Sequence, residues 1–296
     1  MSAAQAQRNP IKAGDWVKTN PLKDIDGIGQ VIVDYVGQGD AISITDLSGK
    51  VVVRIDYGGR ESRPFARALK PRLKAIDARL PVDARSPIFL THWDEDHWCS
   101  ALVGGQAAAK GRWITPRQFT SPRAALRSTR FADVACLPAA LEQIPICFKA
   151  INGDELWCEK ISRYDPTAMT EDCNLTGMAF TVVSAATGDV VFLPGDAPIH
   201  KVPHYARFRA DSHRLRGLVA YHHGAHTHGI EKTEAFLRHW SGQQPGPRVV
   251  FSCGDPNSYD HPWTTHYRKA LPHATLRRPR RVGASIRVAP PDDHPC

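Results

Sequence analysis

Four side chains that commonly bind metal ions fall within six consecutive residues of the segment Thr91-His92-Trp93-Asp94-Glu95-Asp96-His97. Alternate residues of an extended chain point the same way, so His92, Asp94 and Asp96 would share one side. His97 could join them if the chain turns into a helix there. Two imidazoles and two carboxylates are enough to begin two adjacent metal positions. The alternative is a solvated acidic loop that contains two histidines by chance.

Histidine is unevenly distributed along the 296-residue chain. No histidine precedes His92, none lies between residues 98 and 199, and twelve of the fourteen lie at or after His200. Such clustering calls for a chemical explanation. The late group includes the pair His222-His223, which by itself fits either a ligand pair or ordinary loop residues.

Basic residues are concentrated in the C-terminal third. The net charge is +8, residues 200–296 hold 15 basic and 7 acidic side chains, and the first 199 residues hold 23 of each. A basic segment favours contact with a polyanion, of which nucleic acid is the first candidate. Side chains that could hold phosphates or stack on unpaired bases are Tyr259, Trp263, Tyr267, Arg268, Lys269 and the run Arg277-Arg278-Pro279-Arg280-Arg281. The alternative is a solvated arginine run with one of the aromatic residues in the core.

Composition excludes several classes of protein. Hydrophobic residues at 42% and charged residues at 23% are ordinary for a globular chain, and no apolar stretch approaches the roughly 20 residues of a membrane span. We therefore predict a soluble, cytoplasmic protein without a membrane partner. Seven cysteines form an odd count without a Cys-x-x-Cys spacing, which predicts reduced, small buried side chains.

Short strands and helices must position these residues. Apolar, β-branched runs predict strands at residues 30–36, 41–46, 51–56, 88–91, 178–184, 190–193, 218–221, 249–252 and 285–288. Helices are predicted at residues 61–80, with a break near Pro71, and at residues 121–131, 231–240 and 264–271. Residues 136–166 are predicted to be irregular. This order of elements is typical of a layered α/β domain built on two sheets.

The motif at residues 92–97 resembles the His-x-His-x-Asp-His signature of the metallo-β-lactamase superfamily. It has the His-x-Asp-x-Asp-His form found in the soluble domain of ComEC-type DNA-uptake proteins. Further elements of that group match in the same order between about residues 30 and 265: Val36-Gly37-Gln38-Gly39-Asp40, Asp56-Tyr57-Gly58-Gly59, Phe192-Leu193-Pro194-Gly195-Asp196-Ala197, His222-His223-Gly224 and residues 254–262. Taken singly, the two glycine-rich segments are typical of turns.

The resemblance implies a fold and a division of the chain. The fold is the metallo-β-lactamase-like αββα sandwich of class α/β, in which two mixed β-sheets are flanked by helices. We assign residues 29–290 to this domain, residues 1–28 to an N-terminal extension and residues 291–296 to a tail.

The resemblance also implies a dinuclear site for two divalent metal ions, zinc or manganese. Its implied ligands are His92, Asp94, Asp96, His97, Asp196, which would bridge the ions, and His223, with His222 as the alternative to His223. Asp94 stands where the superfamily has a histidine, which makes the ligand set oxygen-rich and widens the choice towards manganese or iron. Asp56 is at most a support for a ligand.

One ligand of the superfamily is absent from the sequence. The superfamily's second motif supplies a further histidine before the bridging aspartate, whereas residues 98–199 contain none. Asn174-Leu175-Thr176 lies where ComEC-type proteins have Asn-x-x-Ser, so an amide or a water molecule could take that place.

Two metal ions about 3.5–4 Å apart lower the pKa of a bound water towards about 7 and stabilise an in-line phosphoryl displacement. Asp96 is therefore a catalytic candidate as well as a ligand. His261 and His226 are candidates for protonating the leaving oxygen, because each follows a predicted strand. Both could equally be ordinary loop residues, and His228 is predicted to be exposed.

Three functions remain open. The favoured one is a phosphodiesterase or nuclease acting on DNA or RNA, and the second is hydrolysis of a small ester, phosphodiester or lactam on the same fold. The third is a non-catalytic nucleic-acid-binding module, which the missing histidine would permit. No oligomeric state is predicted.

Overall fold

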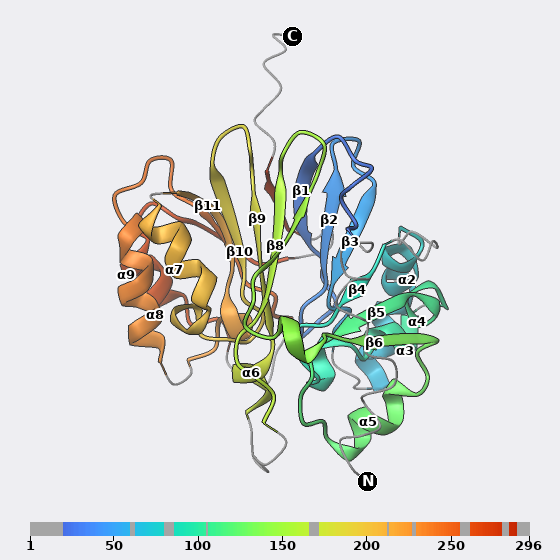
Figure 1. Ribbon diagram of the computed structural model, residues 1–296. Coiled ribbons are helices and arrows are strands. Elements are labelled where there is room, and N and C mark those ends of the chain that lie inside the picture. Colours follow the sequence, from blue (N-terminus) through green and yellow to red (C-terminus); the bar gives the residue numbers. More distant parts are fainter. Residues whose placement is uncertain are drawn as a thin grey trace.

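The computed structural model describes residues 20–288 apart from residues 60–62, 80–85, 105, 166–171, 212, 227–228, 255–260 and 280–283. Within these ranges the chain forms two seven-stranded mixed sheets that pack against each other, with helices on both outer sides (Figure 1). The α/β class and the two flanked sheets are thus confirmed. This is the arrangement that the resemblance to the metallo-β-lactamase superfamily implies.

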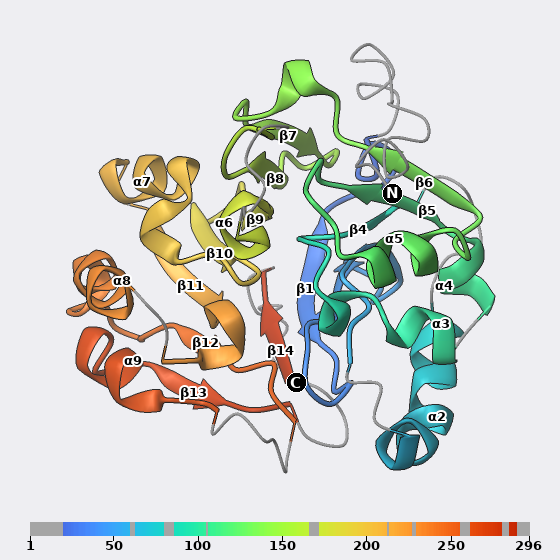
Figure 2. The ribbon, with the colours of Figure 1, turned by 90° about the horizontal axis from the view of Figure 1, so that it is seen from below.

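The first sheet begins as a meander and ends in parallel strands. Its antiparallel strands are β1 (Ile28–Val33), β2 (Ile42–Asp46) and β3 (Val51–Ile55), with β14 (Ala284–Arg287) paired to the free edge of β1. Three parallel strands follow β3: β4 (Ile88–Phe89), β5 (Arg112–Thr115) and β6 (Asp133–Cys136). Parallel neighbours need crossover connections, and the outer side of this sheet is covered by α2 (Arg63–Asp77), α3 (Ser100–Gly104), α4 (Gln106–Lys110) and α5 (Pro122–Ser128) (Figure 2).

The second sheet has the same order of pairings. Its antiparallel strands are β7 (Ile146–Lys149), β8 (Glu155–Lys160), β9 (Met178–Val183) and β10 (Asp189–Leu193). Parallel strands β11 (Arg214–Val219), β12 (Arg248–Val250) and β13 (Thr275–Arg277) complete it. The helices on its outer side are α7 (Pro203–Ala210), α8 (Ile230–Leu237) and α9 (Thr264–Ala270) (Figure 2).

Three apolar clusters hold these layers together. The central cluster joins inward-facing side chains of both sheets, among them Phe89 and Phe180. A second cluster packs α7, α8 and α9 on the second sheet, and a third packs the helices of the other side on the first sheet. Of the predicted N-terminal extension, residues 20–28 are described: Leu22 is fully buried in the central cluster, and Ile28 begins β1. The predicted tail, residues 291–296, lies outside the described residues.

Two predictions of local structure were wrong. Residues 136–166 are not irregular throughout, because they contain β7 and β8. Strand β8 escapes the apolar pattern since it carries Glu159 and Lys160, both buried, whose polar ends bind His204 and the carbonyl of Ser162. Helix α2 also runs through Pro71, which removes one hydrogen bond from the helix without ending it.

The sequence predicted no helix at Pro203–Ala210 and no strands at Arg112–Thr115 or Asp133–Cys136, all of which are present. Among the described residues, no helix is long and apolar enough to cross a membrane.

Candidate metal centre

The polar motif residues meet at one end of the sandwich, in loops that follow the carboxyl ends of strands. His92 to His97 follow β4, Asp196 follows β10, and His222-His223 follow β11. Parallel strands direct their carboxyl ends to the same edge, and β4 is parallel to β3 as β11 is parallel to β10. The topology therefore collects residues that lie far apart in the sequence.

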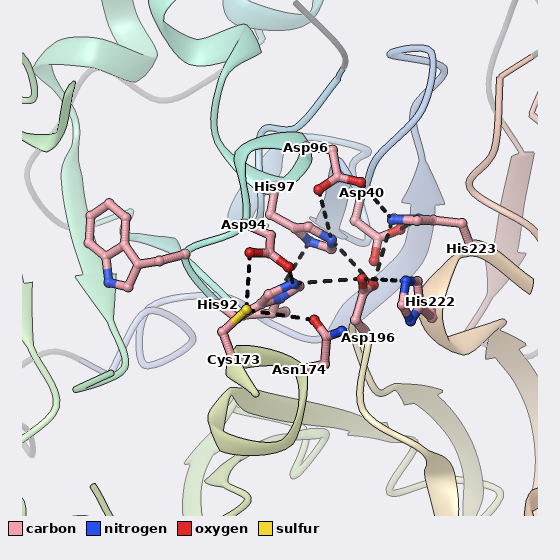
Figure 3. A network of polar contacts seen from close by, with 12 residues as sticks. Asp40, His92, Asp94, Asp96, His97, Cys173, Asn174, Asp196, His222 and His223 are labelled. Carbon is pink, nitrogen blue, oxygen red and sulfur yellow. Dashed lines mark hydrogen bonds and ion pairs between the residues drawn. The ribbon is translucent and has the colours of Figure 1, made fainter. Parts of the chain in front are cut away.

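Asp196 lies at the centre of this cluster, and its two carboxylate oxygens face different pairs of histidines (Figure 3). Oδ2 lies 3.6 Å from Nε2 of His92 and 3.7 Å from Nε2 of His222. Oδ1 lies 3.2 Å from Nε2 of His97 and 3.6 Å from Nε2 of His223. A carboxylate placed in this way can bridge two cations. His222 and His223 are therefore not alternatives in space, since each faces its own oxygen.

The motif carboxylates divide in the same way. Asp94 Oδ2 lies 3.5 Å from Nε2 of His92, on one side of Asp196. Asp96 Oδ2 lies 3.2 Å from Nε2 of His223, on the other side. Two compact groups of possible ligands result: His92 with Asp94 and Cys173, and Asp40 with His97, Asp196 and His223. Within each group, one ligand atom per residue lies within 4.8 Å of all the others.

Several buried atoms at the centre of the cluster have no hydrogen-bond partner among the described residues. They are Nε2 of His92, His97 and His223 and Oδ1 of Asp196. A buried polar atom without a partner costs about 1–3 kcal/mol. Four such atoms gathered around the Asp196 carboxylate fit a site that binds cations, and their imidazole and carboxylate chemistry suits zinc, manganese or iron.

Hydrogen bonds at the outer ring nitrogens fix the tautomers of two histidines. Nδ1 of His97 donates to Asp56 Oδ2 over 2.8 Å, and the Thr91 hydroxyl donates to the same oxygen over 2.7 Å. Because the only hydroxyl proton of Thr91 is used there, Nδ1 of His92 must donate to Thr91 Oγ1, 3.1 Å away. When these rings carry no second proton, their Nε2 lone pairs point at Asp196, and a cation at Nε2, whether a proton or a metal ion, removes the repulsion.

His223 is held by a similar support. Its Nδ1 lies 3.1 Å from Ser252 Oγ and 3.6 Å from Asp40 Oδ1. Asp40 is fully buried, and neither of its carboxylate oxygens has a hydrogen-bond partner among the described residues. Asp40 thus lies near Nδ1 of His223, on the outer side of the ring, as Asp56 lies near Nδ1 of His97.

The cluster is strongly polarised when no cation but the proton is present. Burial raises the pKa of Asp196, but attraction by His223, His97 and His92 outweighs burial and holds this pKa well below its usual range. Burial lowers the pKa of His97, yet Asp196 and Asp56 raise it well above its usual value. Positive charge is therefore favoured at the centre, and metal ions binding there would displace protons.

The backbone at the histidine pair is in an unfavourable conformation. His222 and His223 have φ angles of 47° and 56°, in the left-handed region that non-glycine residues rarely adopt. The amide of His222 donates to the carbonyl of Gly195, and that of Ala225 donates to the carbonyl of His222. Such conformations are typical of functional sites, and here they turn both rings towards Asp196.

All seven predicted metal ligands are brought together, whereas the two predicted proton donors are not equally close. The ring of His261 lies 6.4 Å from that of His222, measured between centroids. The ring of His226 lies against Trp263 and His266, and His226 shows no ring contact with the metal ligands among the described residues. His228 and residues 255–260, including Tyr259, lie outside the described residues.

Sequence reasoning missed two members of the cluster. Asp40 was interpreted as part of a glycine turn, and Cys173 as a small buried side chain. Cys173 directly precedes Asn174, where a substitute for the missing histidine was sought, and its thiol donates to Asp94 Oδ1 over 3.0 Å. Asn174 Oδ1 lies 3.9 Å from the same sulfur. The available signal was the position of Cys173 in the chain.

A pocket of about 590 Å³ opens beside the cluster. Asp196 and His222 form part of its wall, and His200, Lys201 and Lys232 line it as well. A substrate in this pocket would lie against one side of the bridging carboxylate, within reach of two ammonium groups.

No protein-family model and no curated protein matches the chain. Among solved structures, it is similar to a mutant of the CmlA beta-hydroxylase, with 12% identity over 88% of this chain and 54% of that chain and a TM-score of 0.42. It is also similar to the flavodiiron protein from Giardia intestinalis, with 11% identity over 77% of this chain and 61% of that chain and a TM-score of 0.34. The chain thus spans less than two thirds of either protein.

Proposed function

We propose that the protein is a metal-dependent hydrolase that cleaves phosphodiester bonds of nucleic acid at the cluster around Asp196. The observation that carries this proposal is the division of Asp196, whose two oxygens each face two histidines. His92, Asp94 and His222 would hold one divalent ion, and Asp96, His97 and His223 the other. Such a pair of ions supplies an activated water and neutralises charge on the phosphoryl group.

The residues around the ions would position the substrate. Lys201 and Lys232 in the pocket are exposed and can pair with phosphate oxygens. His261, whose ring centroid lies 6.4 Å from that of His222, would give a proton to the leaving oxygen. His226 is not given this role, because its ring packs on Trp263 and His266.

The basic segment supports a polyanionic substrate. Arg277 ends β13, which is parallel to β12 and β11, so it lies at the edge of the sheet that also carries His222. The next residue, Arg278, donates to the carbonyl of His261. Both arginines are exposed and could bind phosphates on either side of the cleaved bond. Tyr267, by contrast, is 1% exposed and packs in the core, whereas Trp263 is 44% exposed and could stack on a base.

A small phosphodiester is the second candidate, and the pocket beside Asp196 favours it, because a volume of about 590 Å³ accommodates a small molecule. Both candidates share one chemistry and differ in how much of the basic surface the substrate covers.

The test is to incubate metal-stripped protein with labelled single- and double-stranded DNA and RNA, and with a small chromogenic phosphodiester, while Mn²⁺ or Zn²⁺ is added. The proposal expects metal-dependent cleavage of at least one nucleic acid that falls steeply with salt. Arg277→Ala should weaken nucleic-acid binding and lower its salt slope by about 0.7–0.9, with unchanged turnover of the small ester. Arg209→Ala, an exposed arginine on α7, is the matched control. Cleavage of the small ester alone would support the second candidate, and no hydrolysis of any diester would overturn both.

A further inference from the structure

We propose that Cys173 binds one of the two metal ions as a thiolate, beside His92, Asp94 and Asp196. It would thereby take the place for which the sequence offers no histidine. This inference rests on the proposed metal site, but it concerns the identity of a ligand and not the reaction.

The distances fit ligands that share one metal ion. With bonds of about 2.0–2.3 Å, neighbouring ligand atoms of a tetrahedral site lie about 3.3–3.8 Å apart. Nε2 of His92 lies 3.5 Å from Asp94 Oδ2 and 3.6 Å from Asp196 Oδ2. The sulfur of Cys173 lies within 4.8 Å of the ligand atoms of His92 and Asp94. The nitrogen of His92, an oxygen of Asp94 and the sulfur of Cys173 therefore form one compact group, with Asp196 Oδ2 beside His92.

The ring of His92 supplies a separate indication of a ligand. His92 is 1% exposed, its Nδ1 is already bound to Thr91, and its Nε2 has no hydrogen-bond partner among the described residues. This orphaned nitrogen points to the same place as the thiol (Figure 3). The thiol of Cys173 does not satisfy Nε2 of His92, because it donates its hydrogen bond to Asp94.

Long-range contacts hold the cysteine in this position. Cys173 begins α6 (Cys173–Thr176), and Gln118 Nε2 donates to the carbonyl of Cys173 over 2.6 Å and to Thr176 Oγ1 over 2.7 Å. Gln118 Oε1 accepts from the amide of Trp93 over 3.2 Å. The buried Gln118 side chain therefore ties α6 directly to the loop that carries His92 and Asp94.

A glycine next to α6 allows the same close approach. A Cβ atom on Gly177 would lie 2.7 Å from the carbonyl oxygen of Thr91 and 3.2 Å from Cβ of His92. Any larger residue would force α6 away from the motif loop. The chain thus has two independent devices that bring the thiol to the metal motif.

The other described cysteines have different surroundings. Cys99, Cys136, Cys158 and Cys253 are buried, and none belongs to a group of possible ligands in the described part of the chain. Cys147 on β7 has a similar partial exposure to Cys173 but likewise belongs to no such group. It provides the matched control.

A thiolate would make the two metal positions chemically unequal. On binding, the S–H proton leaves to solvent and the sulfur lone pair forms the bond to the metal. Sulfur favours zinc or iron over magnesium or manganese, whereas the position around His97 and His223 has only nitrogen and oxygen donors. We therefore expect the His92 side to retain zinc when the other position exchanges for manganese.

The test uses Co²⁺ added to the metal-stripped full-length protein under a non-thiol reductant, without substrate. A cobalt–thiolate bond produces a charge-transfer band in the near ultraviolet. The wild type and Cys147→Ser should show this band at two cobalt ions per chain. Cys173→Ser should lose this band. It should also bind the metal ion on the His92 side at least about tenfold more weakly, which is the range seen when residues that support metal ligands are removed. Cys173→His should restore the stoichiometry without the band.

An unchanged band in Cys173→Ser, or two bound cobalt ions without any band in the wild type, would overturn the inference. Thermal unfolding of the metal-free variants shows whether a lost band reflects a lost fold, and recovery of binding by Cys173→His excludes that explanation. The proposed function fails separately, since a protein that shows the band but cleaves no phosphodiester retains the ligand and lacks the activity. A protein that cleaves a phosphodiester but shows no band would retain the activity and lack the cysteine ligand.

Discussion

The described part of the chain buries histidine beside carboxylate around His204 and around Asp196, and these two clusters differ in whether their ring nitrogens have hydrogen-bond partners. Under α7, Nδ1 of His204 lies 2.6 Å from Glu159 Oε2 and Nε2 lies 2.9 Å from Thr181 Oγ1. Both ring nitrogens have partners, and the amide of His204 also donates to Glu159. Around Asp196, three histidines are equally buried or nearly so, yet each leaves Nε2 without a hydrogen bond among the described residues.

This difference distinguishes the His204 cluster, which is structural, from the Asp196 cluster, which has atoms available to bind a ligand. A complete network gains nothing from a further ion, because all its donors and acceptors are used. In the Asp196 cluster the outer ring nitrogens are fixed by Asp56, Thr91 and Ser252, and the inner nitrogens have no hydrogen-bond partner in the described part of the chain. Both sites bury histidine beside a carboxylate, so the presence of unused ring nitrogens among the described residues, and not burial, distinguishes the Asp196 cluster.

The largest effect is expected for Asp196→Asn. Loss of the bridging carboxylate should reduce bound metal from two ions to fewer than one per chain and lower phosphodiester cleavage by on the order of 10³-fold. Metal analysis after dialysis and initial rates measure this. Asp189 begins β10, the strand that precedes Asp196, and pairs with Arg214, so Asp189→Asn should retain both ions. Equal metal content in Asp196→Asn and wild type would contradict the bridging role.

His204→Ala should lower the stability of the fold and leave metal binding and cleavage unchanged. The buried carboxylate of Glu159 would lose the hydrogen bond from His204 and be left without this partner, which costs about 3 kcal/mol, or roughly a hundredfold in the folding equilibrium. Denaturant unfolding measures this loss. Metal content and cleavage at a temperature well below unfolding should match the wild type. A metal content that fell with an intact fold would remove the distinction between the two clusters.

Asp56→Asn tests the support behind a proposed ligand. Asparagine tolerates the left-handed backbone of this residue, whose φ is 57°, but it has only one acceptor oxygen, so it cannot accept from both the Thr91 amide and the His97 ring as the two carboxylate oxygens do. Weakening such a support lowers metal affinity about 10–100-fold. Competition against a chromogenic chelator gives the affinity, and an unaltered value would show that His97 needs no orientation by Asp56.

The smallest effect concerns a third polar group, which surrounds Glu234 on α8. Burial raises the pKa of Glu234, but hydrogen bonds from His266, Lys269 and Arg238 outweigh it and lower the pKa to about 2 from its ordinary 4.5. A depressed carboxyl pKa stabilises the fold above about pH 4.5, and this contribution is lost as pH falls towards 2. Unfolding curves between pH 6 and pH 3 should converge for wild type and Glu234→Gln. A constant difference between them would contradict the assignment.

The sequence predicted more of the metal motif than of its surroundings. His92 to His97 lie in one local segment, and Asp196 and the histidine pair each follow an apolar strand, so pattern and order were sufficient. Cys173 depends on contacts with Asp94 and Gln118, which are 79 and 55 residues away. No local pattern contains that information. Asp40 was obscured by glycines that also explain a turn.

The same limit applies to the fold. Strands β1 to β3, β9 and β10 show continuous apolar runs and were predicted within a few residues. Strand β8 carries a buried glutamate and a buried lysine, whose partners lie on α7 and in the following turn. A charge that is satisfied from elsewhere in the chain cannot be distinguished in sequence from one that is exposed.

The central claim is that the orphaned atoms around Asp196 bind two divalent ions, and native mass spectrometry of the metal-stripped protein tests it directly. Titration with Zn²⁺ or Mn²⁺ is predicted to add two ions per chain to the wild type. Binding of no ion, or the same number of ions by wild type and Asp196→Asn, would contradict the account.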